Sequence, residues 1–140
     1  MKISARNQLK GTITELISGA VNSEVTLRLA NDQEVTAIIT AASVKNLALA
    51  VGKEAYAIIK ASSVMLVTGE KVNTSARNQL SGIISAVQAG AVNSEVSLDI
   101  GGEQTVAAII TKDSAERLAL ATGMSAQALI KASSIMLAVE

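Results

Sequence analysis

Residues 24–47 read EVTLRLANDQEVTAIITAASVKNL, and their pattern predicts two strands followed by a short helix. Apolar and polar residues first alternate, which is typical of a half-buried strand; the apolar positions are Val25, Leu27 and Leu29. Asn31-Asp32 is a predicted hairpin tip, and residues 35–40 form the return strand. This stretch therefore indicates a β-hairpin that leads directly into a helix.

The spacing of apolar residues changes after the return strand to that of a helix, at Val44, Leu47 and Ala48. Thr40 is the predicted N-cap, and Gly52 is expected to end the helix. The hairpin and the helix are the centre of the predicted fold.

Three further strands surround this centre. Residues 9–17 predict a strand bent near Gly11, residues 54–60 a fourth strand, and residues 64–67 a fifth one after a tight turn. Five short strands with one helix between the third and the fourth favour a Greek-key barrel of the OB type. Two open α+β sheets are the alternative, and they would leave strand edges unpaired.

Every one of these segments recurs 71 residues later without a gap. The clearest copies are residues 4–9 at 75–80, residues 19–25 at 90–96, and residues 60–63 at 131–134. Such a repeat predicts two domains, 1–69 and 70–140, each an OB-like barrel of the all-β class with one short helix. The linker, residues 68–74, is short, so we expect the barrels to lie close together.

The composition predicts association between copies of the chain. The chain is 49% hydrophobic, with one Tyr and neither Phe nor Trp. Each repeat is too small to bury a large core by itself, and association commonly supplies the missing burial. We therefore expect a homo-oligomer.

Several classes of function are disfavoured by what the chain lacks. A net charge of zero and almost no aromatic residues argue against nucleic acid as a partner. The absence of Cys and His removes thiol nucleophiles, imidazole bases and the common zinc sites. No apolar run is long enough to cross a membrane, and no signal peptide is evident, so we expect a cytoplasmic protein that does not bind membranes.

Two basic positions keep their charge in both repeats: Arg6 corresponds to Arg77, and Lys60 corresponds to Lys131. Other charged positions change sign; for example, Asp99 stands at the position equivalent to Arg28. Two cations beside hydroxyl groups and a helix start are the parts of an anion site. The alternatives are a guanidinium paired with a surface carboxylate, a plain turn at residues 19–23, and a serine that only caps its helix.

At these residues the chain resembles the molbindin (Mop) family, in its tandem di-Mop form. The matching segments are Ser-Ala-Arg-Asn-Gln-Leu, Gly-Ala-Val-Asn-Ser-Glu-Val, Ala-Ile-Ile-Thr and Ile-Lys-Ala-Ser-Ser, each present twice. The resemblance implies OB-like barrels that bind molybdate or tungstate between subunits, form a homotrimer and serve molybdenum storage or homeostasis. No catalytic cofactor is implied.

The resemblance also implies two classes of molybdate site. The first, at domain interfaces, transfers to Ser4, Ala5, Arg6, Ser43, Lys60, Ser75, Ala76, Arg77, Ser114 and Lys131. The second, on a threefold axis, transfers to Ala20, Val21, Asn22, Ala91, Val92 and Asn93. Asp113 adds a carboxylate near Ser114, so we expect the two copies of the first class to differ in affinity.

Two rival functions remain. A molybdate-sensing regulatory di-Mop module would work with a transcription factor or a transporter; because the repeat begins at Ile3, we expect no DNA-binding or nucleotide-binding domain before it. An enzyme is the least favoured reading, because no acid–base pair or nucleophile recurs in both repeats.

Overall fold

The computed structural model describes residues 1–140 and contains the predicted elements in both repeats. The first repeat comprises β1 (Asn7–Ser18), β2 (Asn22–Leu29), β3 (Glu34–Thr40), α1 (Ala41–Asn46), β4 (Glu54–Ile59), the 3-10 turn η1 (Ala61–Ser63) and β5 (Met65–Thr68). The second comprises β6 (Asn78–Ala89), β7 (Asn93–Gly101), β8 (Gln104–Thr111), α2 (Lys112–Arg117), β9 (Ser125–Ile130), η2 (Ala132–Ser134) and β10 (Met136–Ala138). Five strands per repeat, with a helix after the third, are confirmed.

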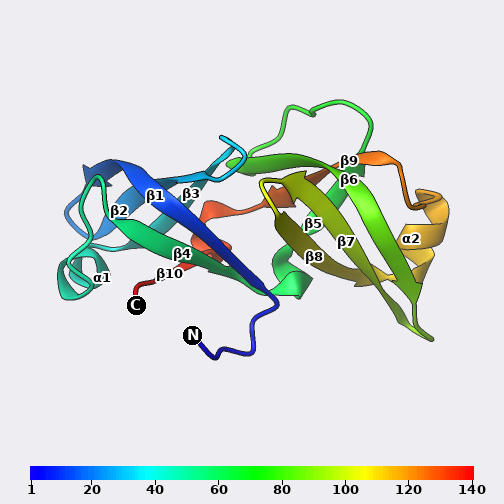
Figure 1. Ribbon diagram of the computed structural model, residues 1–140, viewed down its shortest axis with the longest axis horizontal. Coiled ribbons are helices and arrows are strands. Elements are labelled where there is room, and N and C mark those ends of the chain that lie inside the picture. The colour runs from blue at the N-terminus through cyan, green and yellow to red at the C-terminus, as the bar shows by residue number, and fades with distance from the viewer.

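The two repeats exchange their fifth strands. The sheets have the orders β10-β4-β1-β2-β3 and β5-β9-β6-β7-β8. Leu137 of β10 pairs with Ala57 of β4, and Leu66 of β5 pairs with Ala128 of β9. In Figure 1 the C-terminal strand β10 accordingly lies with β4, in the half of the molecule built by the first repeat. The two five-stranded units that were predicted are therefore present, but each takes its fifth strand from the other repeat. The repeat boundary at residues 69 and 70 stays a prediction.

Each sheet curls so that its two edges approach one another. β3 stands at one edge of the first sheet, and it contacts both β10 at the other edge and η2. β8 contacts β5 and η1 in the same way. Each barrel-like unit is thus closed by the strand and the 3-10 turn of the other repeat, so neither is complete without its neighbour.

The core consists of small aliphatic side chains in one continuous cluster of 23 buried residues drawn from both repeats. The alternation predicted for β2 is confirmed, because Val25, Leu27 and Leu29 are all buried. A single shared core and two exchanged strands make the repeats one structural unit.

Two buried asparagines join the repeats. The side-chain amide of Asn7 donates a hydrogen bond to the carbonyl oxygen of Ala107 (2.9 Å) and accepts one from the main-chain N–H of Ala107 (2.7 Å). Asn78 forms the same pair of bonds with Thr36, at 2.9 and 2.7 Å. Ala107 and Thr36 lie on β8 and β3, the edge strands, so each amide takes the place of a missing neighbouring strand.

Two local expectations are corrected. The irregularity in β1 lies between Ile13 and Glu15, not at Gly11. Gly11 is needed for close packing instead, because a Cβ there would lie 2.7 Å from the carbonyl oxygen of Arg28 on β2.

The helix also ends earlier than expected, since α1 stops at Asn46 and Gly52 belongs to a later turn. Ala48 takes a positive φ of 52°, and the chain then turns so that Leu49 is buried. No helix in the structure is long and apolar enough to span a membrane.

Candidate functional site

The segment before β1 and the segment after β4 form one pocket of about 280 Å³. β1 and β4 are antiparallel, with Asn7 opposite Ile59, so Arg6 and Lys60 are neighbours across the end of the sheet. Four predicted site residues line this pocket, Ser4, Ala5, Arg6 and Lys60. Ser62 lines it too, and the second repeat contributes Ile109 and Met136.

The second repeat has the same arrangement in its backbone. Asn78 pairs with Ile130, which places Arg77 and Lys131 at the corresponding end of β6 and β9. The pairing of two antiparallel strands therefore brings together two motifs that are far apart in sequence. Each motif contributes one of the two cations that both repeats share.

Each of the two arginines is paired with a glutamate of the other repeat. Arg6 forms an ion pair with Glu95, and Arg77 pairs with Glu24 at 2.6 Å. The predicted alternative, a guanidinium on a surface carboxylate, thus describes this structure. Lys60 and Lys131 take part in no ion pair. Since a guanidinium carries five N–H donors, an arginine that binds one carboxylate still has donors for a second anion.

The resemblance implies that the serine of each site comes from the helix start of a neighbouring unit. Thr40 accepts from the N–H of Ser43 at 3.1 Å, and Thr111 caps α2 through Ser114 in the same way, so both N-caps are confirmed. Ser43 does not line the pocket that contains Arg6. Ser114 lines an adjoining pocket of about 340 Å³, which shares Ser62 and Ile109 with it. The helix start beside Arg6 is therefore that of the other repeat.

Asp113, expected to repel an anion near Ser114, forms an ion pair of 3.0 Å with Arg117. Both side chains are largely exposed, at 78% and 71% respectively. The carboxylate is thus balanced by a cation of its own helix, which reduces the expected difference between the two repeats.

The threefold-axis candidates lie on the β1–β2 and β6–β7 connections, and one chain does not bring the two groups together. Val21 and Val92 are 73% and 75% exposed. Their carbonyls accept from the first residues of α1 and α2, both at 2.8 Å. Because these helices lie at opposite ends of the molecule (Figure 1), the groups Ala20, Val21, Asn22 and Ala91, Val92, Asn93 are far apart.

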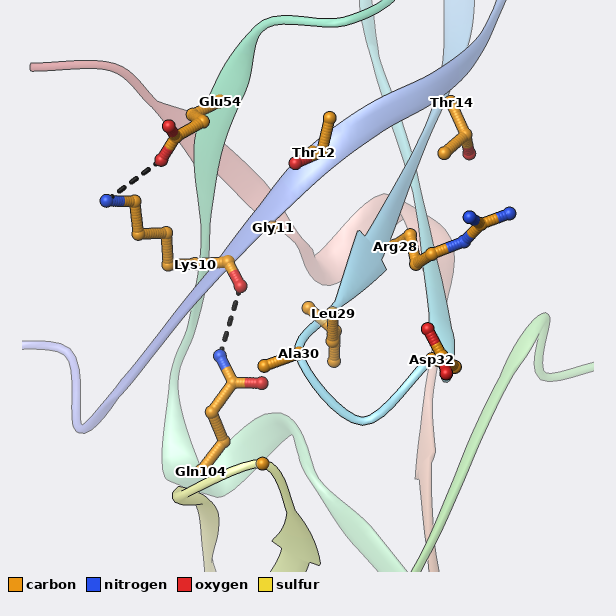
Figure 2. Close-up of a pocket in the computed structure, with 11 residues that line it drawn as sticks. Lys10, Gly11, Thr12, Thr14, Arg28, Leu29, Ala30, Asp32, Glu54 and Gln104 are labelled. Carbon is orange, nitrogen blue, oxygen red and sulfur yellow. Dashed lines mark hydrogen bonds and ion pairs between the residues drawn. The ribbon is translucent and has the colours of Figure 1, made fainter.

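The largest cavity, of about 640 Å³, lies elsewhere and contains none of the predicted site residues. Its charges are balanced, with the cations Lys10 and Arg28 against Asp32 and Glu54 (Figure 2). Lys10 already bonds Glu54 at 2.8 Å, and this hydrogen bond and its charge raise the pKa of Lys10 above 10.5. Two carboxylates line this cavity, whereas none lines the pocket of Arg6 and Lys60, so the cavity suits a dianion less well.

Sequence reasoning missed two pairs of residues, the glutamates Glu24 and Glu95 and the asparagines Asn7 and Asn78. Both pairs stand inside segments that are identical in the two repeats, and that identity was the available signal. Their contacts cross from one repeat to the other, so no pattern within a repeat reveals them.

Comparison with known proteins agrees with this architecture. The TOBE domain matches residues 3–66 and again residues 74–137. The chain therefore belongs to the TOBE-domain family, with two copies of the domain in tandem.

A crystal structure of ModG, described as a cytoplasmic molybdate-binding protein with molybdate bound, is similar over the whole of both chains. Its sequence is 43% identical and its TM-score is 0.96.

Curated relatives share the tandem unit. The molybdenum transport protein ModE of Azotobacter vinelandii is 47% identical over 99% of this chain, and the molybdenum-pterin-binding protein MopA of Rhodobacter capsulatus is 46% identical over 99%. The chain spans about half the length of both relatives, 52% in each case. The ModE of Escherichia coli K12, a DNA-binding transcriptional dual regulator, is 35% identical over 99% of this chain. The expected absence of a nucleic-acid partner stays a prediction.

Proposed function

We propose that this protein is a cytoplasmic molybdate- and tungstate-binding protein that serves intracellular molybdenum storage and homeostasis, without catalytic activity. The main support is the pocket in which Ser4, Ala5 and Arg6 meet Lys60 and Ser62. The full-length similarity to molybdate-bound ModG supports the choice of anion.

The chemistry of the pocket suits a tetrahedral dianion. Molybdate has four acceptor oxygens and two negative charges, and it needs no covalent partner. Arg6 and Lys60 supply two positive charges, while the serine hydroxyls and main-chain N–H groups supply neutral donors. Tungstate has nearly the same size and charge, so we expect the same groups to bind it.

In our proposal the complete sites form in a homotrimer. Val21 and Val92 leave apolar side chains exposed at the two ends of the molecule, where a single chain offers no partner. Three copies around an axis would bring three equivalent Ala-Val-Asn segments together at each end. Ser43 and Ser114 would complete the sites at domain interfaces. A ligand that binds only the assembled form stabilises the trimer by mass action.

The test is to remove the unpaired cation of each proposed site in the full-length chain, with Lys60→Gln and Lys131→Gln in one variant. Neither lysine forms an ion pair in the structure, so we expect the fold and the melting temperature of the free protein to be retained. Equilibrium dialysis against molybdate should show fewer anions bound per chain. Native mass spectrometry gives the number of subunits, for which we expect three.

The matched control is Lys45→Gln, which removes a charge from the last turn of α1. It should bind as many anions as the wild type. If the double variant also binds the wild-type number of anions, Lys60 and Lys131 do not belong to the binding sites. If the wild type binds no molybdate, the proposed function is wrong.

A further inference from the structure

Two ion pairs cross between the repeats at the arginines of the proposed sites. Arg6 is paired with Glu95 of β7, and Arg77 is paired with Glu24 of β2. Glu24 and Glu95 are equivalent positions of the two repeats, so the same contact is built twice with the roles of the repeats exchanged. One carboxylate therefore accompanies each of the two arginines.

These pairs differ from the other side-chain ion pairs in how the carboxylates are held. The side chains of Glu95 and Glu24 are only 26% and 32% exposed, whereas their arginines are 53% and 50% exposed. In the pair of Lys10 with Glu54 both partners are more than half exposed. The glutamates are thus the more buried partners, and the arginines are the more exposed ones.

Glu95 also lies beside the pocket of Arg6. It lines a shallow groove with Asn93 and Ser94, and Ile109 lines both this groove and the pocket. An anion that bonds Arg6 in the pocket therefore lies within a few ångströms of the Glu95 carboxylate.

One of the protein's charges at such a site therefore opposes the binding of an oxyanion. Arg6 and Lys60 together would neutralise a dianion, and Glu95 adds one negative charge. The carboxylate both occupies donors of Arg6 and repels the incoming oxyanion.

We propose that Glu24 and Glu95 are affinity-determining residues of the anion sites, an inference that rests on the proposed function. Each glutamate acts as an internal counter-anion that holds its arginine while the site is empty and gives it up to the oxyanion. The glutamates lower the affinity, so that a bound anion is released readily.

The test uses the full-length variant Glu24→Gln with Glu95→Gln, titrated with sodium molybdate by isothermal titration calorimetry at fixed ionic strength. Glutamine keeps the size and a hydrogen-bond acceptor but removes the charge. Loss of one negative charge about 6 Å from a dianion should lower the Kd for molybdate about tenfold in water-like surroundings. The number of anions bound per chain should not change.

Glu15→Gln is the matched control, because Glu15 is exposed on β1 and forms no ion pair in the structure. Its Kd should stay within about twofold of the wild type. A second variant, Glu24→Asp with Glu95→Asp, keeps the charge but shortens its reach, so its Kd should fall between those of the wild type and the glutamine variant.

An unchanged or higher Kd in the glutamine variant would overturn the inference, as would an aspartate variant that binds as tightly as the glutamine one. A wild type that binds no molybdate would instead reject the proposed function itself.

Discussion

Replacing Asn7 by alanine tests whether buried amides hold the two repeats together. Asn7 is 1% exposed, and its two hydrogen bonds satisfy the N–H and the carbonyl of Ala107 on the edge strand β8. In Asn7→Ala both main-chain groups lose their partner, while Ala107 is itself only 8% exposed. The substitution therefore removes two bonds and leaves two polar groups buried.

The expected loss follows from these contacts. A buried polar group without a partner costs roughly 1–3 kcal/mol, so two such groups, with some access of water at the edge, should cost about 3 kcal/mol. For a chain of this size that corresponds to a fall in Tm of about 10 °C.

Urea unfolding followed by circular dichroism measures the free energy of unfolding at one fixed protein concentration, because association adds to stability. Gln8→Ala is the control, since this neighbouring amide forms only long bonds of 3.4 and 3.3 Å. It should lose less than about 1 kcal/mol. The reasoning fails if Asn7→Ala is no less stable than Gln8→Ala.

Two further predictions concern local packing and charge. Gly82→Ala should destabilise the protein by about 1–3 kcal/mol in the same urea assay, because its Cβ would lie 2.4 Å from the carbonyl oxygen of Asp99; a neutral result would mean that β6 and β7 can move apart. The pKa of Lys10 is raised above 10.5 by Glu54, so this ion pair adds stability below that pH and loses it as the pH rises through the folded-state pKa. Glu54→Gln should lower the pKa of Lys10 in an NMR titration, and an unchanged pKa would contradict the assignment.

Much of the fold could be predicted because its signals are local. The alternation at Val25, Leu27 and Leu29 determines which face of β2 is buried, and Thr40 marks the start of α1 through a bond to Ser43. Less could be predicted where local signals are weak. The end of α1 depends on Ala48, whose positive φ has no sequence signature of the kind that glycine provides.

The candidate site was predictable in its composition and only partly in its geometry. Arg6 and Lys60 were singled out because they keep their charge in both repeats, and the pairing of β1 with β4 does place them in one pocket. The sequence predicts a surface carboxylate as one possible partner of Arg6, but it does not identify Glu95, which stands 89 positions away. An ion pair between distant segments leaves no periodic trace in a sequence.

The order of strands and helices along the chain, the duplication and the two cations shared by both repeats follow from the sequence alone, because each depends on neighbouring residues or on comparison of the two repeats. Which repeat supplies the fifth strand of each sheet is visible only in the folded molecule. The hydrogen-bonding groups of β5 and β10 are equally suited to β4 and β9. The choice depends on where the short linker and the buried Asn7 and Asn78 contacts place the two sheets.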